Sequence, residues 1–251
     1  IEKYKKEIGL PIVIRAIPIF ITEEKAKLMK DCGLTWVMSG LQTGSQRIQR
    51  EVYQRYINNE QFLKTADIVH KLNFCPYYDV ILDSPFETEE DVLETINLLL
   101  KIKKPYVLQL FSLTFFPGTV IYDMAKEKGM EIEDPFTKNY FGFKSTFLNR
   151  IIRLIPLLPN SFIRFLVRNR SNKAVKKLMP VIYFPSTFIL EPITWFRLIL
   201  KSFDGDIKKT SKMVRSFIKT GVKQIALKMP ETYNVALFRS LKKNKLIRVN
   251  D

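Results

Sequence analysis

The first 130 residues alternate between short apolar runs and longer segments with helical spacing. Four runs rich in β-branched and aromatic residues have the length and composition of buried strands, at 12–17, 34–39, 77–82 and 106–113. A polar loop and helical segments follow each run, at 22–33, at 46–54 and 60–72, after Thr88, and at 119–128. Strands that alternate with helices predict an α/β fold with a parallel sheet and right-handed crossovers.

Two of the predicted helices begin with local capping signals. Thr22 precedes two glutamates, and Gly33 ends the same segment. Thr88 stands three residues before Asp91, which is the spacing of a capping box. We therefore expect these residues to mark helix ends, and the second pair needs no catalytic explanation.

The formal net charge of +16 is unevenly distributed along the chain. Residues 1–147 hold 19 Lys and Arg against 20 Asp and Glu, whereas residues 148–251 hold 22 against 5. This asymmetry predicts two regions: residues 1–145, which contain the four βα units, and residues 146–251, which are basic and mainly α-helical. The basic region is expected to meet an anionic partner.

Two segments of the basic region, 146–170 and 207–228, interleave apolar and basic residues at helical spacing. Such helices suit an anionic membrane surface, and the alternative is a helical cap on the sheet with a solvated basic exterior. Residues 181–200 are apolar, but Pro185 and Glu191 argue against a membrane span. Nucleic acid is a less expected partner because no binding motif accompanies the charge.

The two cysteines, Cys32 and Cys75, are too few and too far apart for a zinc site, a redox pair or a complete iron–sulfur site. We expect buried free thiols. His70 stands alone in a helical segment and is expected to be structural or solvated. The sequence starts at Ile1 with neither a Met nor an apolar signal segment, so we expect the natural start upstream. A cytoplasmic location, with peripheral contact to the inner face of the membrane, is the expectation.

Polar loops follow the last three predicted strands, at the edge where parallel folds bind ligands. Their sequences are Gly-Leu-Gln-Thr-Gly-Ser at 40–45, Asp-Val-Ile-Leu-Asp-Ser-Pro-Phe-Glu-Thr at 79–88 and Phe-Pro-Gly-Thr at 116–119. In this order they resemble the fourth-, fifth- and sixth-strand motifs of the radical S-adenosylmethionine (SAM) superfamily. The resemblance covers about residues 12–130. It implies the C-terminal part of a partial (β/α)6 TIM-like barrel, followed by the basic helical extension.

The resemblance implies that these loops bind SAM. Gln42 can donate and accept hydrogen bonds and Asp79 can accept from a hydroxyl, so the two suit a ribose clamp. Arg55 carries a planar fork suited to the cofactor carboxylate, with Arg47 and Arg50 as competitors for that role.

By resemblance alone, Ser45 is expected among the cofactor-binding residues, and Leu113 and Thr114 are expected to lie against the adenine. Plainer interpretations remain open. Gln42 and Arg55 would then be ordinary loop and surface residues, and Asp79 would bond to a helix N-terminus. Glu87 would only place a favourable charge at the start of a helix.

The chain departs from the superfamily pattern at its beginning. The Cys-x3-Cys-x2-Cys loop that carries a four-iron four-sulfur (4Fe-4S) cluster, and the first two barrel strands, do not lie within residues 1–11. We therefore expect a C-terminal fragment of a longer enzyme, inactive by itself, with the cluster ligands upstream. Asp83 replaces the usual glycine. With residues 85–88 it resembles a subgroup that often carries an N-terminal cobalamin-binding domain, which adds cobalamin to the expected cofactors.

The resemblance implies 5′-deoxyadenosyl-radical chemistry on a small molecule. The basic helical extension adds a lipid-like substrate to the expectation. Cobalamin-dependent methylation and rearrangement are the outcomes expected of such relatives. The alternative from another class is a non-catalytic protein that binds a membrane surface or nucleic acid and is built on a degenerate α/β domain.

Overall fold

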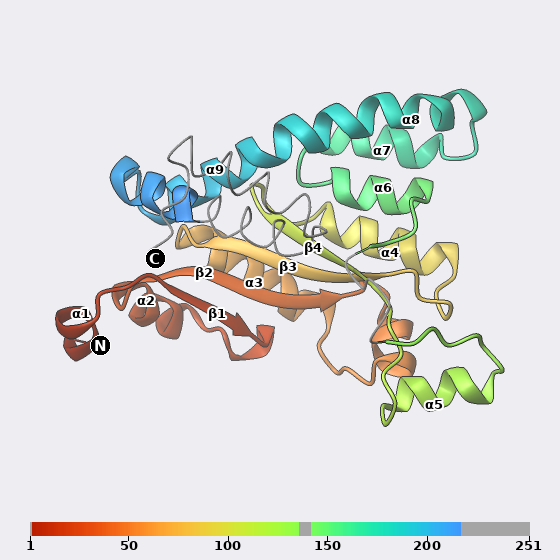
Figure 1. Cartoon of the computed structure of the whole chain (residues 1–251), viewed down its shortest axis with the longest axis horizontal. Helices are drawn as coiled ribbons and strands as arrows, with labels where there is room; N and C mark the ends of the chain where they lie inside the picture. The colour runs from red at the N-terminus through yellow and green to blue at the C-terminus, as the bar shows by residue number, and fades with distance from the viewer. Residues whose placement is uncertain (1, 136–141, 217–251) are drawn as a thin grey trace, which may run out of the picture. The chain divides into compact units, whose positions relative to one another are not determined.

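The computed structural model describes residues 2–135 and 142–216 (Figure 1). The chain divides into two compact units, Ile1–Ser202 and Phe203–Asp251. Every strand and helix labelled in Figure 1 belongs to the first unit. In the second unit residues 207–216 are helical, and the remainder of the predicted helix 207–228 lies outside the described residues.

Four parallel strands form one sheet in sequential order. Their bounds are β1 Ile12–Ala16, β2 Leu34–Gln42, β3 Cys75–Leu82 and β4 Val107–Ser112. Strands follow one another in sequence order in the wall of a (β/α) barrel, whereas in a doubly wound sheet the strand order reverses beside the first strand. The order seen here is therefore that of part of a barrel. The predicted α/β class with a parallel sheet is confirmed.

Helices connect the strands and then continue as a helical region. Their bounds are α1 Glu2–Glu7, α2 Glu23–Asp31, α3 Asn59–Lys71, α4 Glu89–Leu99, α5 Val120–Glu127, α6 Phe147–Leu154, α7 Asn160–Arg168, α8 Lys173–Pro185 and α9 Glu191–Ser202. Shorter turns, of 3-10 type in η1 and of π type in η2 and η3, lie at Pro18–Phe20, Ile48–Val52 and Ser186–Leu190. The predicted elements are confirmed to within a few residues, except that 46–54 contains a π-helical turn.

The two predicted caps are present. Thr22 Oγ1 accepts a hydrogen bond from the backbone N of Lys25 at 3.3 Å, at the start of α2. At the start of α4, Thr88 and Asp91 make both reciprocal bonds of a capping box. These bonds satisfy backbone donors that a helix N-terminus leaves free.

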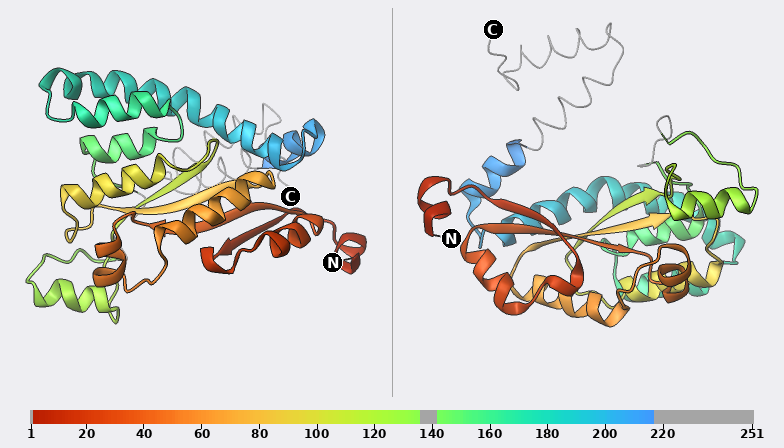
Figure 2. Two further views of the ribbon diagram at one scale, coloured as in Figure 1. Left: turned by 180° about the vertical axis from the view of Figure 1, so that it is seen from behind. Right: turned by 90° about the horizontal axis from the view of Figure 1, so that it is seen from below.

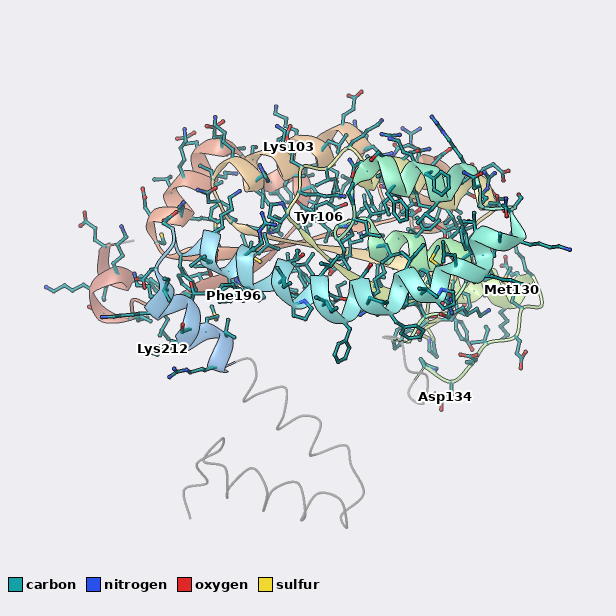
Figure 3. The ribbon with its side chains drawn as sticks, turned by 90° about the horizontal axis from the view of Figure 1, so that it is seen from above. Lys103, Tyr106, Met130, Asp134, Phe196 and Lys212 are labelled. Carbon is teal, nitrogen blue, oxygen red and sulfur yellow. The ribbon has the colours of Figure 1, made fainter. Side chains whose placement is uncertain are left out.

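Helices α2 and α3 lie along one side of the sheet and α9 along the other (Figure 2, right). On the side covered by α2 and α3, Tyr78 of β3 packs edge-on against Phe62 of α3, with ring centroids 5.1 Å apart. Ile96 of α4 belongs to the same buried cluster. Tyr106, inside the molecule in Figure 3, donates from its hydroxyl to the carbonyl oxygen of Leu99 at 2.9 Å. This side holds the main hydrophobic core.

Alternate side chains of each strand point to the opposite face of the sheet. On this face aromatic side chains lie at one end of the strands and polar side chains at the other. Near the amino ends of the strands, the Trp195 ring of α9 lies 5.3 Å from Trp36 and 5.6 Å from Tyr77. Two residues beyond Tyr77, towards the carboxyl end, stands Asp79. Helix α9 therefore covers the amino end of this face.

Helix α6 lies beside α4, and α7 and α8 pack against α6 (Figure 1). Their buried Ile151, Ile163 and Met179 belong to the same core cluster as the strands. The predicted division at residues 145 and 146 marks a change of composition, and the packing continues across it. No helix within the described part of the chain is both long enough and apolar enough to cross a bilayer.

Asp83 fastens this helical region to the end of β3. Its φ of 60° lies in the left-handed region that favours glycine. Its carboxylate accepts hydrogen bonds from the backbone N of Lys144 and from Asn149 Nδ2, each at 2.8 Å. The aspartate that replaces the usual glycine thus has its own structural partners.

Candidate functional site

Asp79, at the carboxyl end of β3, is the centre of the polar surface on the sheet. It is only 3% exposed. Arg15 Nη1 of β1 donates to Asp79 Oδ2 at 2.5 Å. This pair crosses the intervening strand β2 at Gly40, which is the register partner of Asp79 and has no side chain to obstruct the arginine. Asp79 is thus held by an arginine, and the alternative contact with a helix N-terminus is wrong.

Two buried acceptor atoms at this surface lack donors. Among the described residues, neither Asp79 Oδ1 nor Gln109 Oε1 has a hydrogen-bond partner. Asp79 and Gln109 are register partners on β3 and β4, so their side chains leave the sheet on the same side. Buried acceptors are normally paired, and an unpaired one requires an explanation. A ligand with hydroxyl donors would satisfy both atoms.

Gln42 ends β2 in an unusual conformation. Its φ is 69°, a left-handed value uncommon for residues other than glycine. The register with β3 shifts between Gly40 and Gln42, so the strand contains a bulge there. The bulge turns the amide of Gln42 back over Gly40, where an added Cβ would clash with Gln42 Nε2. The strand end therefore presents this amide beside Asp79.

Of the three arginines considered for the carboxylate, the contacts favour Arg55. Arg55 Nη2 donates to the carbonyl oxygen of Gly40 at 3.0 Å. A Cβ on Gly40 would lie 3.4 Å from Arg55 Nη1 and would also touch the Gln42 amide. Arg47 is instead paired with Asp91, and Arg50 is exposed. Gln42, Arg55 and Asp79 therefore meet around one backbone position.

The charges of the site are partly desolvated. Burial raises the pKa of Asp79, and the neighbouring charges of Arg15 and Arg55 oppose that rise. Burial lowers the pKa of Arg55, and Asp79 opposes that fall. The group contains two guanidinium groups and one carboxylate. A ligand that brings one anionic group would balance them.

The loop after β2 is joined to α4 beneath this surface. Gly44 N donates to Thr95 Oγ1 at 2.7 Å, and Ser45 Oγ donates to Asp91 Oδ1 at 2.5 Å. Arg47 also contacts Asp91. Ser45 is fully buried, so its hydroxyl lies inside this joint and not at the ligand surface where we had expected it.

Leu113 and Thr114 follow the end of β4. Leu113 is buried in a second cluster with Ile48 and Phe86. Thr114 is half-buried, and its hydroxyl donates to the carbonyl oxygen of Ser112 at 3.3 Å. Contact of these two residues with an adenine ring stays a prediction.

Glu87 has more than a helix-terminal role. Thr43 Oγ1 donates to Glu87 Oε1 at 2.9 Å, across from the loop after β2. Burial raises the pKa of Glu87 to about 7, and the nearby carboxylates of Asp91 and Asp83 add to the rise. Glu87 therefore changes charge near neutral pH.

We predict that Glu87→Gln stabilises the protein at pH 8 by about 3 kcal/mol. The folded protein binds the Glu87 proton more tightly than the unfolded chain, so the wild type loses stability as pH rises from about 4.5 to 7. Glutamine keeps an acceptor for Thr43 and removes this loss. Urea unfolding at pH 5 and pH 8 measures the free energy of unfolding of both proteins, with exposed Glu90→Gln as the matched control. Equal pH dependence in the wild type and Glu87→Gln would contradict the prediction.

A cavity of about 470 Å³ lies beside the end of β3. Asp83, Ser84 and Glu87 line it on one side and Phe147 on another. The buried Ser84 hydroxyl has no hydrogen-bond partner among the described residues. The cavity is a candidate place for a second small group at the end of β3.

The described residues do not fit an iron–sulfur cluster. Within them, no group of three or more His, Cys, Asp or Glu side chains could hold a metal ion. Cys75 is buried and Cys32 half-buried, and both are free thiols. Burial raises the pKa of Cys75 to about 12, which disfavours the thiolate that binds metals.

Sequence reasoning missed Arg15 and Gln109. Each is a polar residue inside an otherwise apolar strand run, Ile-Val-Ile-Arg-Ala and Val-Leu-Gln-Leu-Phe. A polar side chain in a buried strand is unfavourable unless it has a partner, so this interruption was the available signal.

The fold and the site define an α/β sheet of barrel-wall type that presents a polar ligand surface at the carboxyl ends of its strands. Residues 1–99 match the Radical SAM superfamily. The matched stretch includes Gln42, Arg55 and Asp79 and excludes α5–α9. No curated protein matches the chain.

Several solved structures are similar to part of the chain. Elp3 of the archaeon Methanocaldococcus infernus shares 18% identity over 49% of this chain and 29% of its own, with a TM-score of 0.43. The radical S-adenosylmethionine methyltransferase TsrM of Kitasatospora setae, with tryptophan and a SAM analogue bound, shares 17% over 51% and 26%, with a TM-score of 0.44.

Coproporphyrinogen III oxidase (HemN) of Escherichia coli, described as a radical SAM enzyme, shares 18% identity over 63% of this chain and 32% of its own. Its TM-score is 0.41. The chain thus spans about a third or less of the length of these three proteins.

Proposed function

We propose that this chain is the C-terminal part of a radical SAM enzyme and supplies the half of the site that holds the ribose and the carboxylate of SAM. The carrying observation is the buried, donor-free Asp79 Oδ1 beside Arg55 and Gln42. The superfamily match of residues 1–99 gives the ligand its chemical class.

The ribose and the carboxylate of SAM each have a matching group at the site. The two ribose hydroxyls would donate to Asp79 Oδ1 and Gln109 Oε1, which the fold leaves unpaired. The Gln42 amide would donate to or accept from the same hydroxyls. The carboxylate would lie against Arg55 and balance the excess positive charge of the group.

The proteins of this class use SAM as a source of a 5′-deoxyadenosyl radical, and the protein's part is binding and orientation. This chain's residues would fix the ribose, which sets the position of the reactive carbon. The 4Fe-4S cluster and cobalamin would be carried by preceding sequence. Methylation or rearrangement of a small lipid-like molecule is the proposed reaction.

Binding of S-adenosylhomocysteine, which keeps the ribose and the carboxylate, tests the proposal. We predict that Arg55→Lys weakens binding about tenfold, because lysine keeps the charge and loses the planar two-donor fork. Isothermal titration of the 251-residue chain measures the affinity. Exposed Arg50→Lys is the control and should bind as the wild type does.

Two results would count against the proposal. The first is a wild-type chain without saturable binding of S-adenosylhomocysteine. The second is an equal loss in Arg50→Lys and Arg55→Lys, which would remove the assignment of the carboxylate to Arg55.

A further inference from the structure

A continuous apolar surface runs along α8, η3 and α9. Every exposed side chain from Leu178 to Phe196 is apolar. Seven of them are large, and we call six of these the apolar stripe: Leu178, Val181, Phe184, Phe188, Ile193 and Phe196; the seventh is Ile189. Phe188 is 87% exposed, Val181 67% and Phe184 64%. A patch of this kind on a protein surface marks an interaction site more often than chance.

The backbone keeps these side chains on one face. Their spacings of three or four residues follow the helical period from Leu178 to Phe188. The five-residue step from Phe188 to Ile193 spans the end of the π-helical turn Ser186–Leu190, which adds one residue to a turn. The stripe extends about 27 Å at 1.5 Å per residue. Figure 3 shows α8 and α9 following one another along the first unit, with Phe196 on α9.

Positive charge stands at both ends of the stripe. Exposed Lys173, Lys176 and Lys177 precede it, and Arg197 follows it. Residues 147–202 contain ten Lys and Arg and a single acidic residue, Glu191. Glu191 is already neutralised by Arg153, at 3.0 Å.

We propose that the apolar stripe lies in the surface of an anionic phospholipid bilayer, with α8 and α9 parallel to the membrane plane. An interfacial helix of this kind inserts apolar side chains at the level of the headgroups, while Lys and Arg at its ends meet the lipid phosphates. The exposed phenylalanines of the stripe would reach the boundary between the headgroups and the acyl chains. No helix has to cross the bilayer for this contact.

A second copy of the chain fits this surface less well. In a two-fold dimer the stripe would meet itself, either parallel or antiparallel. Both arrangements would bring Lys177 or Arg197 of one copy onto a basic end of the other. Like charges opposed across an interface are unfavourable, whereas an anionic lipid surface attracts both ends.

The test measures insertion at a chosen residue, because basic residues elsewhere in the chain could bind anionic vesicles by charge alone. Phe188→Cys is labelled with the environment-sensitive dye NBD in a Cys32→Ser background, in which the remaining Cys75 is buried. The full chain is mixed with vesicles of 70% phosphatidylcholine and 30% phosphatidylglycerol. We expect a blue shift of the dye and its quenching by lipids brominated near the headgroup.

A matched probe and a matched variant complete the experiment. Phe20→Cys carries the dye at a site that is 60% exposed and outside the stripe, and it should show neither effect. Phe184→Ser with Phe188→Ser should reduce flotation with the same vesicles at 0.5 M salt at least tenfold, whereas Phe20→Ser should leave it unchanged.

Three outcomes would overturn the inference. Vesicle binding without a blue shift at position 188 would place the contact elsewhere. A shift of equal size at positions 20 and 188 would mean non-specific adsorption. A shift that depends on protein concentration without vesicles would assign the stripe to a second copy. None of these measurements involves SAM, so they are independent of the proposed enzyme site.

Discussion

Asp79→Asn is expected to lower the affinity of the chain for S-adenosylhomocysteine about 100-fold. The carboxylate offers a buried acceptor atom, Oδ1, that no described residue occupies. Replacing it with an amide removes a charge-assisted hydrogen bond to a ribose hydroxyl. The amide is a neutral and weaker acceptor, whereas Arg55→Lys keeps the positive charge at position 55, so the loss should exceed that of Arg55→Lys.

The pH dependence gives this prediction a second measurement. Burial raises the pKa of Asp79, and the protonated carboxyl is a weaker acceptor for the ribose hydroxyl than the carboxylate is. The wild type should therefore bind more weakly as pH falls through the Asp79 pKa, and Asp79→Asn should show no such fall. Isothermal titration from pH 4.5 to 8 measures both effects.

The control for Asp79→Asn is Asp67→Asn. Asp67 is an exposed aspartate paired with Lys103 on the surface. It should bind S-adenosylhomocysteine as the wild type does at every pH. Unchanged affinity in a folded Asp79→Asn protein, judged by circular dichroism, would contradict the ribose assignment.

Gly44→Ala is expected to destabilise the first unit by about 3 kcal/mol or more. A Cβ at this position would lie 2.5 Å from Thr95 Cα and 2.9 Å from the carbonyl oxygen of Glu94. Both are backbone atoms of α4, so no side-chain rotation relieves the clash. The joint that holds Ser45 against Asp91 would have to open, and the loop carrying Gln42 would move with it.

Urea unfolding followed by tryptophan fluorescence measures this effect, because Trp36 and Trp195 both lie in the first unit. An added methyl group can cost stability through a steric clash or through an unfavourable positive φ, and Gly129→Ala measures the second cost alone. Gly129 has a φ of 62° with no atom within 4 Å of the added Cβ, so it should lose only about 1 kcal/mol. Equal losses at Gly44 and Gly129 would show that the approach of α4 is not the cause.

The contact between α4 and the loop at residues 40–45 could not be predicted from the sequence. The sequence indicated a ligand loop at residues 40–45 and assigned its serine to the cofactor. The structure brings Thr43, Gly44 and Ser45 onto α4, about 50 residues further along the chain, and uses them as a joint. Only the glutamine of that loop remains at the ligand surface.

Local sequence patterns predicted the strands, the helix starts and the edge of the sheet at which Gln42, Arg55 and Asp79 are found. These features depend on local spacing and on the chemistry of single residues, which the sequence displays directly. It also showed the basic character of residues 148–251.

Which side chains share the site depends on how the strands pair and pack. Arg15 reaches Asp79 because β2 has a glycine between them, and Gln109 stands beside Asp79 because of strand register. The apolar stripe is likewise the face that stays exposed after α8 packs against α6 and α9 packs against β3. Contacts between residues distant in sequence depend on packing and register, which local patterns do not specify.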